Sequence, residues 1–148
     1  MLAPVINVDG HQIGIHKTFL KPDGSGKWPF SDKCLQRETC GPIRGGAVRL
    51  APCDPGRGLA IAEGIETAAS VTQLFDVPAW VALSAPGLAA LELPPSICSI
   101  LICADHDAVG LEAALTAKTR WLSEGRKARL RWPRQAGDDF NDILRRGC

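Results

Sequence analysis

The sequence predicts an α/β fold in two parts: a small β-rich subdomain over residues 1–57, then a parallel sheet of about four strands with helices on both faces over residues 58–148. Two observations support this. The first part is rich in glycine-containing turns and short runs of β-branched residues. From Leu59 onward, short apolar segments alternate with segments of helical periodicity, and strands that are connected through helices run parallel.

The first part predicts several short strands. Residues 3–20 predict two strands joined at Asp9 and Gly10, because this dipeptide tolerates the positive φ of a tight hairpin turn. The other segments of this part predict a loop, one or two further strands and a linker, over residues 21–29, 41–52 and 53–58 respectively.

The second part predicts four strands that alternate with helices. Apolar runs predict the strands over residues 59–63, 79–84, 98–104 and 127–133. Helical spacing predicts helices over residues 65–75, 87–93 and 109–125, and a short last helix over residues 138–146, capped by Asp138 or Asp139. In the first helix, Ile65, Ala68, Ala69 and Thr72 are expected to face the sheet; in the third, Leu111, Ala114, Leu115, Lys118 and Leu122 lie at helical spacing.

The composition excludes several classes of protein. No run of about 18 apolar residues and no signal-peptide pattern occurs, so we expect a cytoplasmic protein with no membrane partner. The chain contains no tyrosine, which excludes catalysis through a phosphotyrosine link. The cysteines lack the paired spacing of a zinc site, so we expect no zinc and free thiols, with Cys98 and Cys103 in the core. The six are Cys34, Cys40, Cys53, Cys98, Cys103 and Cys148.

Acidic residues follow three of the four predicted strands. Glu63 ends the first strand, Asp105 and Asp107 come just after the third, and Asp139 follows the fourth. Because the carboxyl ends of parallel strands meet at one edge of a sheet, we expect these side chains to share one crevice. Carboxylates this close repel one another unless a cation lies between them, and oxygen ligands favour Mg²⁺ or Mn²⁺. Taken singly, each acid is also consistent with a helix cap or a surface position.

Four segments together resemble the Toprim domain, a Rossmann-like fold shared by primases, topoisomerases and some nucleases. They are AEGIETA (62–68), ALSAPGL (82–88), ICADHDAVG (102–110) and GDDFNDIL (137–144). The most similar type is that of the primases of phages and mobile elements.

The resemblance implies roles for the acidic residues. Glu63, Asp105 and Asp107 would be catalytic and, with Asp139, would hold two Mg²⁺ or Mn²⁺ ions. Many primases carry another acid four residues after the glutamate, where this chain has Thr67. Glu66 and Asp142 are candidates for accessory acidic residues of this metal site.

The resemblance also implies a DNA primase: metal-dependent synthesis of short primers from nucleoside triphosphates on a single-stranded DNA template during phage or mobile-element replication, with a replicative helicase as a candidate partner. Residues 1–57 hold 8 Lys and Arg against 5 Asp and Glu. The candidate phosphate ligands in this part are Lys17, Lys27, Arg44 and Arg49.

Two alternatives stay open. The same acids can activate water, which would make the protein a metal-dependent nuclease. The chain can also be a non-catalytic fragment that acts as a nucleic-acid or protein binding module. Primases of this type usually carry a zinc-binding module upstream, and we expect template recognition to be incomplete without one.

Overall fold

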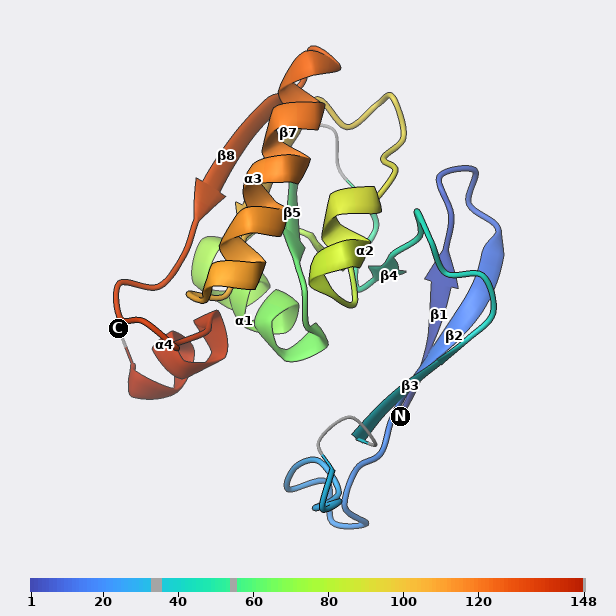
Figure 1. The fold of residues 1–148 in the computed structure, drawn as a ribbon, viewed down its shortest axis with the longest axis vertical. Coiled ribbons are helices and arrows are strands. Elements are labelled where there is room, and N and C mark those ends of the chain that lie inside the picture. The colour runs from blue at the N-terminus through green and yellow to red at the C-terminus, as the bar shows by residue number, and fades with distance from the viewer. Residues whose placement is uncertain (33–35, 54–55, 148) are drawn as a thin grey trace.

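The computed structural model describes residues 1–32, 36–53 and 56–147, which form two sheets (Figure 1). The three-stranded antiparallel sheet consists of β1 (Leu2–Ile6), β2 (Gln12–Thr18) and β3 (Arg37–Cys40). The five-stranded sheet consists of β4 (Val48–Arg49), β5 (Leu59–Ala62), β6 (Ala79–Val81), β7 (Ser99–Cys103) and β8 (Lys127–Arg131). The described residues also form helices α1 (Ile65–Phe75), α2 (Ala85–Ala90), α3 (Ala108–Ser123) and α4 (Phe140–Arg146).

The five-stranded sheet has the order β4-β6-β5-β7-β8 and is parallel except for β4. Helices α2 and α3 pack on one face of the sheet, and α1 and α4 pack on the other. The predicted α/β class, with four parallel strands and helices on both faces, is confirmed.

Side chains of the central strands alternate between two hydrophobic cores, as the period of a strand requires. In β5, Leu59 and Ile61 contact α2 and α3, whereas Ala60 and Ala62 contact α1 and α4. All four residues are at most 2% exposed. Strands buried on both faces read as continuous apolar runs, which explains why these strands are visible in the sequence.

The N-terminal part is joined to this sheet through β1 and β4. The hairpin between β1 and β2 turns at Gly10, which has a φ of 87°. At the end of β1, Ile6 exchanges two backbone hydrogen bonds with Ala47, at 2.8 and 2.9 Å. Strand β4 follows directly and pairs with β6, with Val48 opposite Val81. Residues 1–50 therefore contribute an edge strand to the sheet of the second part.

Several element bounds differ from the prediction, although α1 has the predicted bounds. Strand β6 was predicted to reach residue 84, but it ends at Val81, and Leu83 has a φ of 73° that no strand residue adopts. Helix α2 begins two residues early, at Ala85, because the Ser84 side chain accepts a hydrogen bond from the Gly87 amide. Strand β3 was not predicted, since all of its residues are exposed and show no apolar alternation.

The predicted buried face of α1 was partly wrong, and two of the residues at helical spacing in α3 are exposed. In α1, the buried residues are Thr67, Ala68, Ser70 and Val71. In α3, they are Gly110, Ala113, Ala114, Ala117 and Trp121, whereas Leu115 and Leu122 are 54% and 49% exposed. Helix α3 packs closely against α2, and small side chains permit this close approach where leucines would not.

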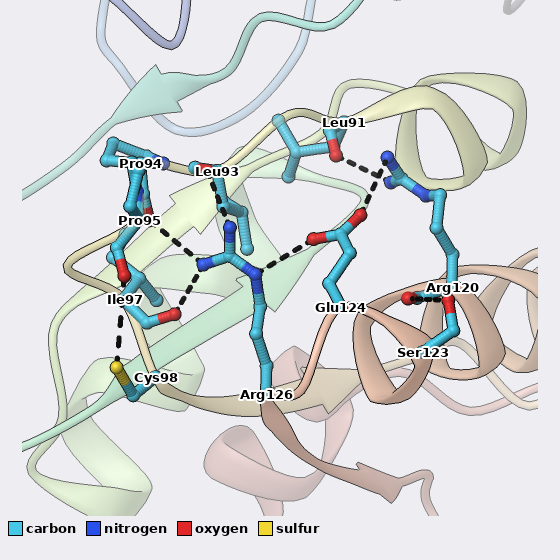
Figure 2. Close-up of polar contacts among 10 residues, drawn as sticks. All are labelled: Leu91, Leu93, Pro94, Pro95, Ile97, Cys98, Arg120, Ser123, Glu124 and Arg126. Atoms are coloured by element: carbon cyan, nitrogen blue, oxygen red, sulfur yellow. Dashed lines mark hydrogen bonds and ion pairs between the residues drawn. The ribbon is translucent and has the colours of Figure 1, made fainter.

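A polar network fixes the connection between α2 and β7 to the end of α3 (Figure 2). The Arg126 guanidinium donates hydrogen bonds to the carbonyl oxygens of Leu93, Pro94 and Ile97, at 2.9, 2.9 and 2.5 Å. It also forms an ion pair with Glu124 at 2.9 Å. The Arg126 side chain is only 13% exposed, so it satisfies carbonyl groups of an irregular segment that would otherwise lack donors.

Cys40, Cys98 and Cys103 are free thiols, as predicted, and Cys34 and Cys148 lie outside the described residues. Cys103 is buried, as predicted. Cys98 was expected in the core but is exposed, because it precedes β7 on the connection from α2. The predicted linker over residues 53–58 is described except for residues 54–55. None of the helices in the described part is long and apolar enough to span a bilayer.

Candidate active site

A pocket of about 750 Å³ lies at the carboxyl ends of β5 and β7. Glu63 directly follows β5, and Asp105 comes two residues after β7. Both side chains line the pocket, together with Asp139 and Glu66. The structure therefore brings together acids from three separate segments of the chain, at the sheet edge where open α/β folds bind their ligands.

The two central acids share an environment that disfavours negative charge. Burial raises the pKa of Glu63 to about 7, and the neighbouring Asp105 and Asp107 add to this shift. Burial also raises the pKa of Asp105 to about 6, with further contributions from Asp139 and Asp107. Within the described part of the chain, one oxygen of each group, Oε1 of Glu63 and Oδ1 of Asp105, is buried without a hydrogen-bond partner. Such carboxylates are stabilised either by protonation or by a cation that balances their charge.

The other predicted acids act as helix caps. Asp107 precedes α3, and its Oδ1 accepts a hydrogen bond from the Gly110 amide at 2.8 Å. Asp107 is exposed and does not line the pocket. Asp139 precedes α4 and forms a capping box with Asp142, in which each side chain accepts a hydrogen bond from the backbone of the other. Asp142 also raises the pKa of Asp105.

Gly110 gives the carboxylates room in the first turn of α3. A Cβ on this residue would lie 2.9 Å from Oε1 of Glu63, 3.3 Å from the backbone oxygen of Asp105 and 3.4 Å from Oδ1 of Asp107. The glycine thus allows the carboxylates of Glu63 and Asp107 to approach the same point of the helix. Any side chain here would displace Glu63.

This set of residues fits a divalent cation. The available donors are carboxylate oxygens, which Mg²⁺ and Mn²⁺ prefer, and two of these oxygens are buried without partners. Within residues 1–32, 36–53 and 56–147, no three His, Cys, Asp or Glu side chains lie close enough to one another to hold a metal ion as they are placed. The fit therefore rests on the chemistry and burial of the donors.

Of the four predicted phosphate ligands, Lys27 lines the pocket. Its Nζ forms an ion pair with Oε1 of Glu66 at 2.6 Å, which connects the loop after β2 to the first turn of α1. Burial alone would raise the pKa of Glu66, but the hydrogen bond from Lys27, a backbone hydrogen bond and the charges of Lys27 and Arg37 together outweigh burial, so the net shift is downward. Glu66 is therefore ionised at neutral pH and is already partnered by a cation.

The other three predicted cations lie elsewhere. Lys17 is paired with Glu38 at 3.1 Å on the antiparallel sheet. Arg44 lines a separate hollow beside α2. The Arg49 guanidinium stacks on Trp80, 4.1 Å from the ring centroid, and donates a hydrogen bond to the backbone oxygen of Asn7 at 2.6 Å. None of the three lines the acidic pocket.

Sequence reasoning missed two cations that do line the pocket, Arg37 and Arg145. Arg37 lies on β3 opposite Thr18, and its charge lowers the pKa values of both Glu63 and Asp105. No local signal in the sequence marks it, because its position depends on the register between β2 and β3. Arg145 lies in the last turn of α4. Arg145 follows Asn141 by four residues, so helical spacing could have predicted that the two lie on the same side of the last helix. Asn141 also lines the pocket.

We expect Gly110→Ala to weaken divalent-cation binding about tenfold while the protein stays folded. Alanine favours helix formation over glycine by about 1 kcal/mol, but here its Cβ would push the mobile end of Glu63 out of position. The measurement is the rise in melting temperature on titration with Mn²⁺. Gly64→Ala is the control, because a Cβ there would meet no atom closer than 3.5 Å. Equal Mn²⁺ titrations for the two variants would contradict this role.

We expect the metal-free protein to lose stability as the pH rises from about 4 toward 7. The folded pKa values of Glu63 and Asp105 lie above their ordinary values of 4.5 and 3.8, so the folded protein binds more protons than the unfolded chain in this interval. The free energy of unfolding then falls with rising pH and levels off above about 7. Urea unfolding in EDTA at several pH values measures this. The same measurement on the Glu63→Gln, Asp105→Asn double variant accounts for the contributions of all other titrating groups. The free energy of unfolding of this variant should change less with pH than that of the wild type.

Two known domain families match the sequence. Residues 58–148 match the Toprim domain family, and residues 1–50 match a domain of unknown function, DUF7146. No protein of curated function matches the sequence.

Solved structures of DNA primases share the fold. The chain is similar to a DNA primase domain from Pseudomonas aeruginosa, with a TM-score of 0.62 and 19% identity over 99% of this chain and 46% of that one. The primase fragment of the bacteriophage T7 primase-helicase protein gives a TM-score of 0.67 and 17% identity, over 99% of this chain and 57% of that one. The DnaG primase catalytic domain bound to single-stranded DNA gives a TM-score of 0.61 and 18% identity, over 99% of this chain and 47% of that one. The chain thus spans about half the length of these structures.

Proposed function

Because this chain belongs to the Toprim domain family, we propose that it is the catalytic core of a DNA primase, which joins nucleotides into short primers on a single-stranded DNA template. The fold is shared with DNA primases, and the activity is what we propose. The template, the nucleoside triphosphates and a replicative helicase would be its partners. The fold of the DnaG domain bound to single-stranded DNA and that of the T7 primase-helicase fragment support these choices.

The observation that carries the proposal is the pair of buried, unpartnered carboxylate oxygens of Glu63 and Asp105. Burying charge without a partner costs stability, so an arrangement of this kind indicates a function that repays the cost. The pocket that Glu63 and Asp105 line is large enough for a nucleotide and lies at the edge of the sheet used by ligands in α/β folds.

In the proposed reaction, the 3′-oxygen of one nucleotide forms a bond to the α-phosphorus of a nucleoside triphosphate. The bond from that phosphorus to the bridging oxygen breaks, and pyrophosphate leaves with the electron pair. In this proposal, Glu63 takes the proton of the 3′-hydroxyl group.

Glu63, Asp105 and Asp139, with Asp107 beside them, would hold the two Mg²⁺ or Mn²⁺ ions of this site. When bound, such ions neutralise the charge of the phosphate oxygens and lower the pKa of the attacking hydroxyl group. Lys27 and Arg37, which line the pocket from the N-terminal part, would bind the phosphates of the incoming nucleotide. Asp142 would keep Asp139 in position through the capping box, and Glu66 would position Lys27.

The experiment that tests the proposal incubates the chain with single-stranded DNA, labelled ribonucleotides and Mn²⁺, then separates the products by size. Short labelled oligomers are the expected result, and the Asp105→Asn variant should not produce them. Because the chain spans only about half of the primases it resembles, the assay should be repeated with a separate zinc-binding module added. In a parallel reaction with labelled DNA, loss of that DNA without new oligomers would identify a nuclease, and no reaction in either assay would favour a binding module.

A further inference from the structure

A second groove, of about 490 Å³, lies on the outer side of β8 and shares no lining residue with the acidic pocket. We call it the β8 groove. Its walls carry four cations, and its floor is apolar. The cations are Arg57, Lys127, Arg129 and Arg131, and the apolar residues of the floor include Phe75, Val77 and Leu101.

The topology explains why this face of β8 is open. Strand β8 is at the edge of the sheet, and α3 covers the face that carries Ala128 and Leu130 (Figure 1). On the other face, α1 packs on β5, β6 and β7. The alternate residues Lys127, Arg129 and Arg131 are therefore exposed on that second face, in a row beside the end of α1.

The charge of this row is not balanced within the protein. Residues 127–134 hold four cations and no acid. No ion pair within the described part of the chain involves Lys127, Arg129 or Arg131. The Arg131 guanidinium lies 5.8 Å from the ring centroid of Phe75, so it reaches over the floor of the groove. Like charges on one strand repel each other, and a bound anion would relieve this repulsion.

The shape of the site selects the kind of anion. Alternate residues of a strand are about 7 Å apart, so the three cations form a straight row that suits a linear polyanion. The apolar floor suits sugars and bases, since single-strand sites combine cations with apolar or aromatic surfaces. One end of the row also reaches the catalytic edge, because Arg131 pairs with Cys103, two residues before Asp105.

We propose that the β8 groove binds the sugar-phosphate backbone of single-stranded nucleic acid, as a site separate from the acidic pocket. The choice of nucleic acid over another polyanion rests on the proposed primase function. The location of the binding site rests on the cations and apolar residues of the β8 groove. A strand held there would lead along β8 to the carboxyl edge of the sheet.

The test measures binding of a fluorescein-labelled oligothymidylate by anisotropy, in EDTA, at several salt concentrations. The triple variant Lys127→Gln, Arg129→Gln, Arg131→Gln should bind at least about tenfold more weakly, and its log-log salt dependence should be less steep by about 2. Among single variants, Arg129→Gln should weaken binding more than Lys118→Gln, which removes the same charge from α3 on the other side of the sheet. If the triple variant does not fold, the Arg129→Glu variant replaces it and should also weaken binding.

Three results would overturn the proposal. Binding within twofold of wild type would show that the groove does not hold the strand. Self-association of the variant with unchanged DNA binding would show that the charges only protect the edge strand from pairing with other copies. Loss of polyglutamate binding with unchanged DNA binding would show that the partner is an acidic protein segment. Because EDTA removes divalent cations, failure here is distinct from failure of primer synthesis, which the Asp105→Asn variant tests.

Discussion

Replacement of Glu63 by Gln is expected to lower the rate of primer synthesis by about 10² to 10⁴-fold, while raising the melting temperature of the metal-free protein. The two effects have the same cause. Burial and the charges of Asp105 and Asp107 raise the pKa of Glu63 to about 7, so the ionised group destabilises the fold at pH 8. A neutral amide of the same size removes this cost and also removes the proton acceptor. Initial rates with Mn²⁺ and calorimetry in EDTA measure the two quantities.

Glu112→Gln is the matched control for this result. Glu112 is exposed on α3, so the same chemical change there should alter neither the rate nor the melting temperature. Asp105→Asn should behave like Glu63→Gln, because burial also raises the pKa of Asp105. A Glu63→Gln variant that is less stable than wild type in EDTA, or that keeps full activity, would show that the acid has a structural role.

Replacement of Arg126 by Met is expected to lower the free energy of unfolding by about 3 kcal/mol. The long apolar side chain preserves much of the packing, but the carbonyl groups of Leu93, Pro94 and Ile97 lose their shared donor (Figure 2). Urea unfolding measures the change. Because these residues lie far from the catalytic edge of β7, the primer assay at a temperature where the variant is folded should be unaffected.

Arg120→Met provides the comparison. Arg120 lies on the last turn of α3 and donates to one described carbonyl, that of Leu91, at 2.6 Å. Its ion pair with Glu124 is long, at 3.9 Å, so we expect a loss of about 1 kcal/mol. Equal losses for the two arginine variants would mean that charge near the end of α3, and not the number of carbonyl groups satisfied, stabilises this region.

The parts of the fold that the sequence predicted correctly are those with local signals. The bounds of α1 follow from helical periodicity over residues 65–75, and β5 and β7 follow from apolar runs. Strand β3 and the exposed leucines of α3 had no such signal. The register of β3 depends on β2, which lies about twenty residues earlier, and the packing of α3 depends on its distance from α2.

The same distinction applies to the candidate site. Glu63 and Asp105 could be placed because each follows a strand, and parallel strands end at one edge. The contribution of Asp107 was harder to foresee, since one of its oxygens caps α3. The position of Arg37 in the pocket could not be predicted at all, because it depends on how the N-terminal part folds back over the acids.

Strand β4 has a consequence for attempts to recombine this protein with its relatives. The two family matches meet between residues 50 and 58, yet Val48 and Arg49 complete the sheet that the second match describes. In a chimeric protein joined between residues 50 and 58, the edge strand β4 would come from one protein and the rest of the sheet from the other. Swapped segments would therefore have to agree at the pairing of Val48 with Val81 and at the stacking of Arg49 on Trp80.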